Sequence, residues 1–246
     1  MKQKFLFIVL FFLTSNIYSQ NKMRTVEELI DINEPGWKIV SEWINTAKNK
    51  VEILKADPSK AIDALYKTQV STRSPMGSII YNTGGILIDN GWIRILGSGN
   101  QKLNRTLPDW NKGKSFSEYG EQPKFLLIAD DVIGGFFILN GGEFGEDLGK
   151  IFYFSPESLE YEPLGINYSE FLQFCFNTNL EDFYQNKRWK DWKNEVSILD
   201  GNKMFSFQPY LWSKEAKGIE DINKIRRKEI PVEEQYFFNL ELRERL

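Results

Sequence analysis

The 246 residues are 41% hydrophobic and 15% aromatic, enough for a sizeable core, and they include no histidine and one cysteine. These counts exclude catalytic triads with an imidazole base, metal sites with imidazole ligands, multi-thiolate metal sites and an internal disulfide, so we expect no cofactor. Without Lys2 and Lys4, 29 of the 31 basic residues remain against 34 acidic ones, a net charge of −5. This balance argues against a nucleic-acid partner, which requires a basic surface.

The first nineteen residues have the order of a secretory signal. Lys2 and Lys4 precede a nine-residue apolar run, and Ile17-Tyr18-Ser19 follows before Gln20. The run is short for a bilayer span, which takes about twenty residues, so an uncleaved anchor is the weaker interpretation. We therefore predict cleavage after Ser19, no stable membrane span in the mature chain, and export to the periplasm or the exterior. The residue directly after the cleavage site is Gln20 and not a cysteine, which argues against a lipoprotein.

The next segment predicts a lead-in of helices and one strand. Thr25 and Glu28 have the spacing of a capping box, and Asp57-Pro58 has the order of a helix cap followed by a first-turn proline. Apolar residues at helical spacing predict a second helix over 37–49, and 51–54 is a short apolar strand. The order is therefore helix, helix, strand, helix.

A hairpin is predicted next. An apolar run at 79–81 and a glycine break at Gly84-Gly85 precede a strand at 86–88, and Asn90-Gly91 is a turn signal because both residues tolerate positive φ. Residues 92–96 form the returning strand. The polar stretch 100–123 is interpreted as a long loop, a common location for binding residues.

The central stretch, 125–176, predicts the core architecture. Apolar runs at 125–129, 136–139 and 151–154, separated by Asp, Gly and Asn clusters, are typical of an antiparallel meander. Apolar residues at helical spacing from near Ser169 through Cys175 predict a covering helix, in which Cys175 is a buried, inert thiol.

The remaining chain predicts packing elements and a polar surface. We expect helices at 180–184 and 189–199, strand segments at 204–207 and 210–212, an exposed basic cluster around Arg226, and a short C-terminal helix. No linker divides the chain after the signal. The predicted fold class is therefore a single α+β domain over 23–246, with a central antiparallel meander sheet flanked by helices.

Several motifs of the central stretch resemble a known family. They are Ala129-Asp130-Asp131, Gly134-Gly135, Asn140-Gly141-Gly142, the segment FYFSPESLEYEPL and the segment YSEFLQF. From about Met23 to the C-terminus the chain resembles the bacterial DUF2625 family, a domain of unknown function. The layout of about 79–178 is also similar to the SUKH (Smi1/Knr4-like) superfamily, many of whose members bind and neutralise toxins. This similarity implies a SUKH-like fold and a non-enzymatic, immunity-like protein-binding module.

Acidic turns suggest where a partner would bind. Residues 118–162 contain ten carboxylates but only Lys124 and Lys150, a charge layout that attracts a basic protein partner. The glycines there permit close approach to the backbone. The candidate partner-binding residues are Asp130, Asp131, Asn140, Gly141, Gly142, Glu143, Glu146 and Asp147, together with Trp92 and Trp110.

A second hypothesis is an envelope glycan-binding protein or a carboxylate-dependent hydrolase. Two carboxylates roughly 5–10 Å apart can act as acid and base on a glycosidic bond. Trp92, beside the hairpin tip, and Trp110, in the long loop, are the candidate platforms for a sugar ring. The simpler interpretation of the same residues is that the carboxylates occupy exposed turns and the tryptophans pack in the core.

Overall fold

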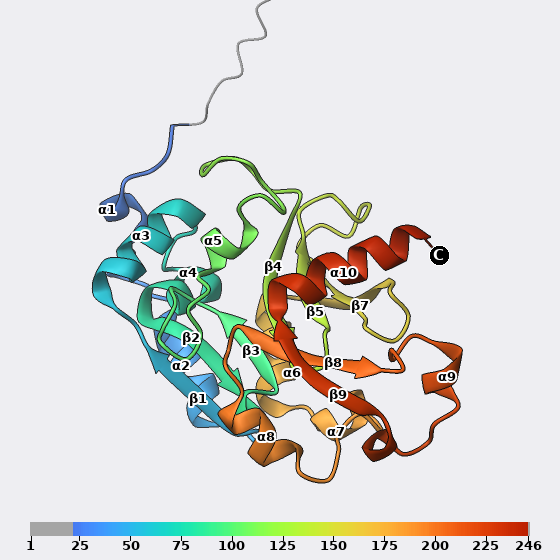
Figure 1. Cartoon of the computed structure of the whole chain (residues 1–246). Coiled ribbons are helices and arrows are strands. Elements are labelled where there is room, and N and C mark those ends of the chain that lie inside the picture. Colours follow the sequence, from blue (N-terminus) through green and yellow to red (C-terminus); the bar gives the residue numbers. More distant parts are fainter. Residues whose placement is uncertain (1–21, 246) are drawn as a thin grey trace, which may run out of the picture.

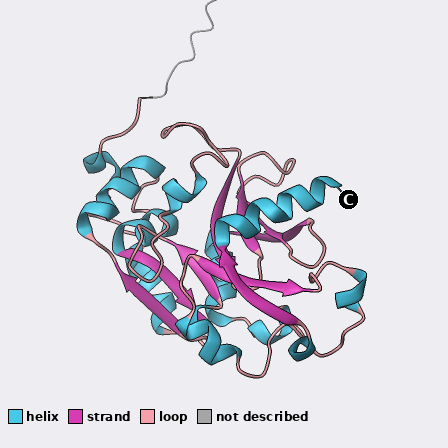
Figure 2. Ribbon diagram, viewed as in Figure 1, coloured by secondary structure: helices cyan, strands magenta, loops and turns pink. Residues whose placement is uncertain are grey.

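The strands of the main sheet are arranged in space in the order of the chain, each antiparallel to the next, from β1 to β7 (Figures 1 and 2). This is seen in a computed structural model that describes residues 22–245. Within that range a two-stranded sheet, β8–β9, accompanies the seven-stranded sheet in a single α+β domain. The expected α+β meander is thus confirmed, while the signal segment 1–19 lies outside the described residues.

The strands are β1 (Val51–Lys55), β2 (Thr83–Ile88), β3 (Ile93–Leu96), β4 (Phe125–Asp131), β5 (Phe136–Asn140), β6 (Lys150–Phe154), β7 (Tyr161–Asn167), β8 (Lys203–Gln208) and β9 (Arg226–Pro231). The helices are α1 (Val26–Leu29), α2 (Trp37–Asn45), α3 (Pro58–Thr68), α4 (Pro75–Asn82), α5 (Leu107–Asn111), α6 (Tyr168–Asn177), α7 (Leu180–Phe183), α8 (Trp192–Ile198), α9 (Lys214–Lys217) and α10 (Val232–Arg245), with short 3₁₀ turns η1 (Asp89–Gly91) and η2 (Ile222–Lys224).

Local capping signals place the helix starts. The Thr25 side chain caps α1 in the predicted capping box with Glu28, and Asp57 caps α3, whose first residue is Pro58. Ser74 caps α4 in the same way, so the apolar run at 79–81 is helical. The predicted second helix ends four residues early, at Asn45.

The three strands predicted for the central stretch are confirmed, and the sheet extends beyond them on both sides. The hairpin β2–β3 is also present, and its turn has Asn90 at φ 62° and Gly91 at φ 94°. β7 has no counterpart in the prediction because it is a partly exposed edge strand that carries Pro163 and Gly165. The loop at 100–123 contains α5, whose side chains are mostly buried.

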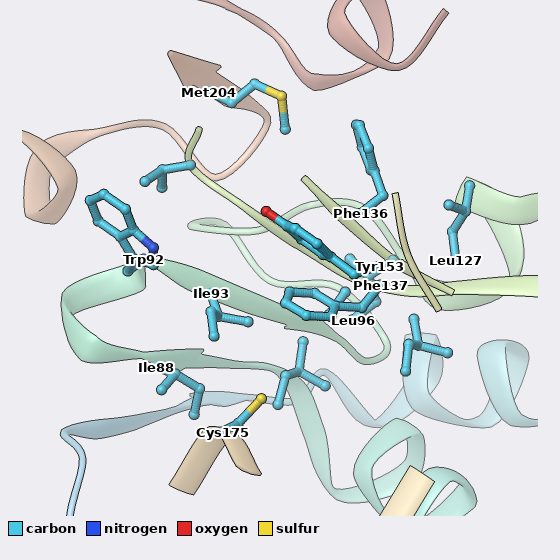
Figure 3. Close-up of a cluster of buried hydrophobic side chains, with 14 of the residues drawn as sticks. Ile88, Trp92, Ile93, Leu96, Leu127, Phe136, Phe137, Tyr153, Cys175 and Met204 are labelled. Carbon is cyan, nitrogen blue, oxygen red and sulfur yellow. The ribbon is translucent and has the colours of Figure 1, made fainter. Parts of the chain in front are cut away.

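The main sheet has a buried layer on each face. Phe137 of β5 contacts Phe171 of α6, with a centroid distance of 4.9 Å, while its neighbour Phe136 contacts Tyr236 of α10 at 5.1 Å. Figure 3 shows the same division, with Phe136 and Met204 on one side of the strands and Phe137 and Cys175 on the other. Helix α6 therefore covers one face, and β8, β9 and α10 cover the other.

The C-terminal part differs most from the prediction. The basic cluster around Arg226 begins strand β9, which pairs with β8 over six residues, from Arg226↔Gln208 to Pro231↔Lys203. The segment 210–212, expected to be a strand, is a loop. Figure 1 shows β8 and β9 crossing in front of the main sheet, with α10 following from β9. In the described part of the chain no helix has the length and apolar character that a bilayer crossing requires.

Candidate functional site

Asp130 was expected at an exposed turn, but it lies inside β4 and is 0% exposed. Its Oδ1 accepts a hydrogen bond from Nε of Arg94 at 2.6 Å, and its Oδ2 accepts one from Nη1 of Arg105 at 2.6 Å. Arg94 also donates to the carbonyl oxygen of Lys203 at the start of β8. A buried carboxylate is tolerated when cations and hydrogen bonds compensate it. Asp130 therefore connects the main sheet to β8 and is not available to a partner.

Asp131 is also 0% exposed, although it was expected beside Asp130 on the surface. Its Oδ2 accepts hydrogen bonds from the hydroxyls of Tyr153 at 2.7 Å and Tyr184 at 3.0 Å. Its Oδ1 accepts from the backbone N–H groups of Ile133 at 3.0 Å and Gly135 at 2.8 Å. Burial raises the pKa of Asp131, and the hydrogen bonds to the carboxylate partly oppose this rise. The residue organises the turn between β4 and β5.

These two carboxylates do not form an acid–base pair. Successive side chains of a strand point to opposite faces, so Asp130 faces β8 and Asp131 faces the helices. A glycosidic bond would have to lie between two groups that the sheet itself separates. The hydrolase hypothesis therefore loses its most central residues.

Asn140 shapes the loop between β5 and β6. It is 1% exposed, and its Oδ1 accepts from the N–H groups of Gly142 at 2.8 Å and Phe144 at 3.0 Å, while its Nδ2 donates to the carbonyl of Asp147 at 3.0 Å. Gly142 has φ +121°, a conformation that favours glycine. A side chain at Gly141 would place its Cβ 2.4 Å from the carbonyl oxygen of Pro123. These three residues therefore have structural roles.

The acidic part of this loop does lie on the surface. Glu143, Glu146 and Asp147 are exposed. Glu143 is 4.0 Å from Nζ of Lys124, whereas Glu146 and Asp147 form no ion pair with any residue of the described range. The structure thus separates the predicted site into a buried pair of aspartates and an exposed acidic loop.

Neither candidate tryptophan is an open platform. Trp92 is 0% exposed and packs against Tyr184 and Trp192 at centroid distances of 5.3 and 5.0 Å, with the Arg188 guanidinium 4.9 Å from its ring. Trp110 is 6% exposed, and Nζ of Lys114 lies 4.1 Å from its ring. Segments far away in the sequence cover the hairpin tip and the loop, so the simpler interpretation, core packing, holds for both.

A large concave surface lies instead on the β8–β9 side. A groove of about 470 Å³ lies between the hairpin and α10, and a more open one of about 1060 Å³ lies beside α9. The two share Gln208, Tyr210 and Arg226. We call the pair the hairpin groove; its remaining side chains are Ser158, Ser206, Phe207, Pro209, Trp212, Ser213, Lys214, Glu215, Lys217, Arg227, Lys228, Ile230, Glu234 and Phe238.

The hairpin groove combines aromatic and basic side chains. The rings of Tyr210 and Trp212 are parallel within 7°, with centroids 5.9 Å apart, and Tyr210 is 39% exposed. Arg226 and Lys228 are exposed, and neither forms an ion pair with another residue of 22–245. In the half beside α10, Arg226 and Lys228 accompany one carboxylate, Glu234, and in the half beside α9, Lys214, Lys217 and Arg226 accompany Glu215. The arrangement suits an anionic ligand that also has apolar surface.

The sequence interpretation missed this site because it treated the basic cluster as ordinary solvated surface. A usable signal was present: consecutive charges that end in Ile230-Pro231 are typical of an exposed edge strand. Successive side chains of a strand point to opposite faces. Accordingly, the side chain of Arg227 faces away from the groove toward Glu195, with nitrogen–oxygen distances of 3.0 and 2.6 Å.

In the described residues no group of three or more His, Cys, Asp or Glu side chains is placed to hold a metal ion. Cys175 is buried, as predicted, and burial raises the pKa of its thiol well above the ordinary value.

Comparisons with known proteins place the chain among uncharacterised relatives. The profile of DUF2625, described as a protein of unknown function, matches residues 26–235. An uncharacterized protein of Haemophilus influenzae is 48% identical over 217 residues, 88% of this chain and 94% of the relative. The putative uncharacterized protein YbfG of Escherichia coli is 42% identical over 197 residues, 79% of this chain and 89% of the relative. No solved structure matches the chain, so the SUKH likeness stays a prediction.

Proposed function

The chain belongs to the DUF2625 family of proteins of unknown function, and we propose that it is a non-catalytic protein-binding module whose working surface is the hairpin groove. Family membership supplies no activity that could be transferred, so the proposal depends on the site. Concave surfaces with exposed aromatics and a few convergent polar groups are the usual location of binding.

The proposal rests on one observation: the convergent carboxylates are buried, whereas cations of the groove are exposed to solvent. The carboxylates with the most convergent partners, Asp130 and Asp131, are 0% exposed and are engaged by other side chains. The exposed cations Arg226 and Lys228, in contrast, line a groove beside Tyr210. A surface with available charge and aromatic area, and without an accessible acid–base pair, favours binding over catalysis.

The expected export of the chain indicates where a partner would be found. The secretory order of residues 1–19 supports a periplasmic or extracellular protein. If the immunity-like role implied by the SUKH similarity is correct, the partner acts in the cell envelope, on the wall or on the membrane.

The exposed acidic loop supports a second candidate surface. Glu146 and Asp147 have no ionic partner among residues 22–245, and their field would attract a basic protein. The acidic loop is negatively charged and the hairpin groove is mainly positively charged. Reversing the charge of the groove alone therefore shows which of the two surfaces a partner uses.

The test is capture from an envelope extract with the immobilised chain from Gln20 onward. The double variant Arg226→Glu, Lys228→Glu reverses the groove, and Lys38→Glu, Lys48→Glu makes the same charge change on exposed lysines of and after α2. A partner lost with the groove variant and retained with the control supports the proposal. A partner retained by both variants contradicts it, and turnover of glycan oligomers by the wild-type chain would favour the hydrolase.

A further inference from the structure

Strand β9 has an open edge. It pairs with β8 on one side, and among residues 22–245 no other strand pairs with it. Such an edge presents unpaired backbone N–H and C=O groups that can template an additional strand. The direction of each group follows from the β8–β9 register.

The register assigns the outward groups to two residues. The N–H of Val232 donates to the carbonyl of Asn202 at 2.9 Å, just beyond the Lys203↔Pro231 pair. Since hydrogen-bonded and non-hydrogen-bonded pairs alternate in an antiparallel ladder, Arg226 and Lys228 bond inward to β8, and Arg227 and Glu229 direct their backbone groups outward. The hydrogen bonds of β8 are consistent with this assignment. The N–H of Phe205, opposite Glu229, points away from β9 and donates to the carbonyl of Val132 at 2.7 Å.

The outward groups have room for a partner. Outside the β8–β9 ladder, neither the N–H of Arg227 nor that of Glu229 donates to a backbone acceptor in the part of the chain that the structure describes. Both residues line a trough of about 570 Å³, together with Phe205 of β8, Glu195 of α8 and Asn223. Pro231, at the end of the strand, has no N–H to offer and so marks the limit of the edge.

Side-chain alternation determines what kind of strand fits. Arg226 and Lys228 share the face that looks into the hairpin groove, two residues apart, which is the repeat of a strand. A second copy of β9 would bring like charges together and is disfavoured. A segment with carboxylates at every second position would instead place one opposite each cation.

We infer that the β9 edge binds an extended acidic peptide segment, which adds as a further strand with its carboxylates facing Arg226 and Lys228. This inference rests on the proposed function and specifies its partner. The backbone groups of Arg227 and Glu229 hold the main chain of the peptide, and the uncharged residues between its carboxylates face the trough, where Glu195 and Glu229 would repel further carboxylates.

The experiment uses a labelled ten-residue peptide of alternating glutamate and valine, with a peptide of five glutamates followed by five valines as the composition control. The alternating peptide should bind more tightly, and added salt should weaken it. Arg226→Glu, Lys228→Glu should weaken binding by about tenfold, and Lys38→Glu, Lys48→Glu should leave it unchanged.

Hydrogen exchange tests the backbone geometry. In the free protein the amides of Arg227 and Glu229 should exchange faster than those of Arg226 and Lys228, and the peptide should slow the first pair. Equal binding of both peptides, or no slowing at Arg227 and Glu229, overturns the inference. If the peptide fails to bind while capture from the extract still requires Arg226 and Lys228, this inference fails and the proposed function stands; if capture does not require them, the proposed function itself fails.

Discussion

Asp130 and Asp131 are consecutive residues of β4, yet their carboxylates lie on opposite faces of the main sheet, Asp130 against Arg94 and Asp131 against Tyr153. One residue joins the sheet to the β8–β9 layer, and the other stabilises the turn into β5. The two adjacent carboxylates, which in the sequence suggest an acid–base pair, therefore have separate structural roles.

Replacing Asp130 should destabilise the protein strongly. Asp130→Asn leaves the buried guanidinium of Arg94 without its counter-ion, and breaking a buried pair costs about 3–5 kcal/mol. Urea unfolding measures the loss, with Asp147→Asn as an exposed control that should change stability by no more than about 0.5 kcal/mol. The double variant Arg94→Met, Asp130→Leu should recover part of the lost unfolding free energy. A double variant that is less stable than Asp130→Asn would contradict this interpretation.

Replacing Asp131 should change the pH dependence of stability. Because burial raises its pKa in the folded state above the ordinary 3.8, its contribution is greatest below 3.8 and is lost as pH rises through the raised value. The difference in unfolding free energy between the wild type and Asp131→Asn should therefore fall as pH rises from 3.8 toward neutrality. Urea unfolding across this range checks the sign. A difference that grows with pH would mean that the hydrogen bonds from the tyrosines outweigh desolvation.

Charge reversal in the acidic loop should leave the fold intact. Glu143→Lys, Glu146→Lys and Asp147→Lys change exposed side chains, so the combined variant should shift stability by only about 0.5 kcal/mol. Thermal melts measure this, paired with association rates at two salt concentrations for any captured partner. A slower, less salt-sensitive association would locate a basic partner at the loop. Unchanged binding would exclude this surface, and unfolding would show that the loop is structural.

Neither chelator nor reductant should lower the melting temperature. The sequence has no histidine and no second cysteine, and Cys175 is buried with a raised thiol pKa. A thiol reagent should modify Cys175 only after denaturation, which mass spectrometry can follow. Modification of the native protein, or a clear loss of stability with either agent, would contradict the assignment of Cys175 to the core.

The mature protein should begin at Gln20. The apolar run of nine residues is well short of the roughly twenty that span a bilayer, and a small residue precedes the expected cleavage site. Mass spectrometry of the N-terminus of the native protein tests this. A chain in the cell that still starts at Met1 would remove the basis for export and for an envelope partner.

The elements that depend on neighbouring residues could be predicted from the order of the residues alone. The capping side chains of Thr25 and Asp57 bond within their own helix starts, and the strands of the central stretch are short apolar runs between turn residues. The meander follows from the same local order, because each strand pairs with the next one in the chain.

The accessibility of the polar and aromatic residues, in contrast, depends on how distant segments pack together. Asp130 is buried because Arg94 and Arg105, 36 and 25 residues earlier, compensate its charge, and Trp92 is buried because Tyr184 and Trp192 pack over the hairpin. The charged segment that begins at Arg226 forms an open edge because β8 pairs with one side of β9 and no described strand pairs with the other. Burial depends on contacts between segments that are distant in the chain, and no local pattern of residues encodes those contacts.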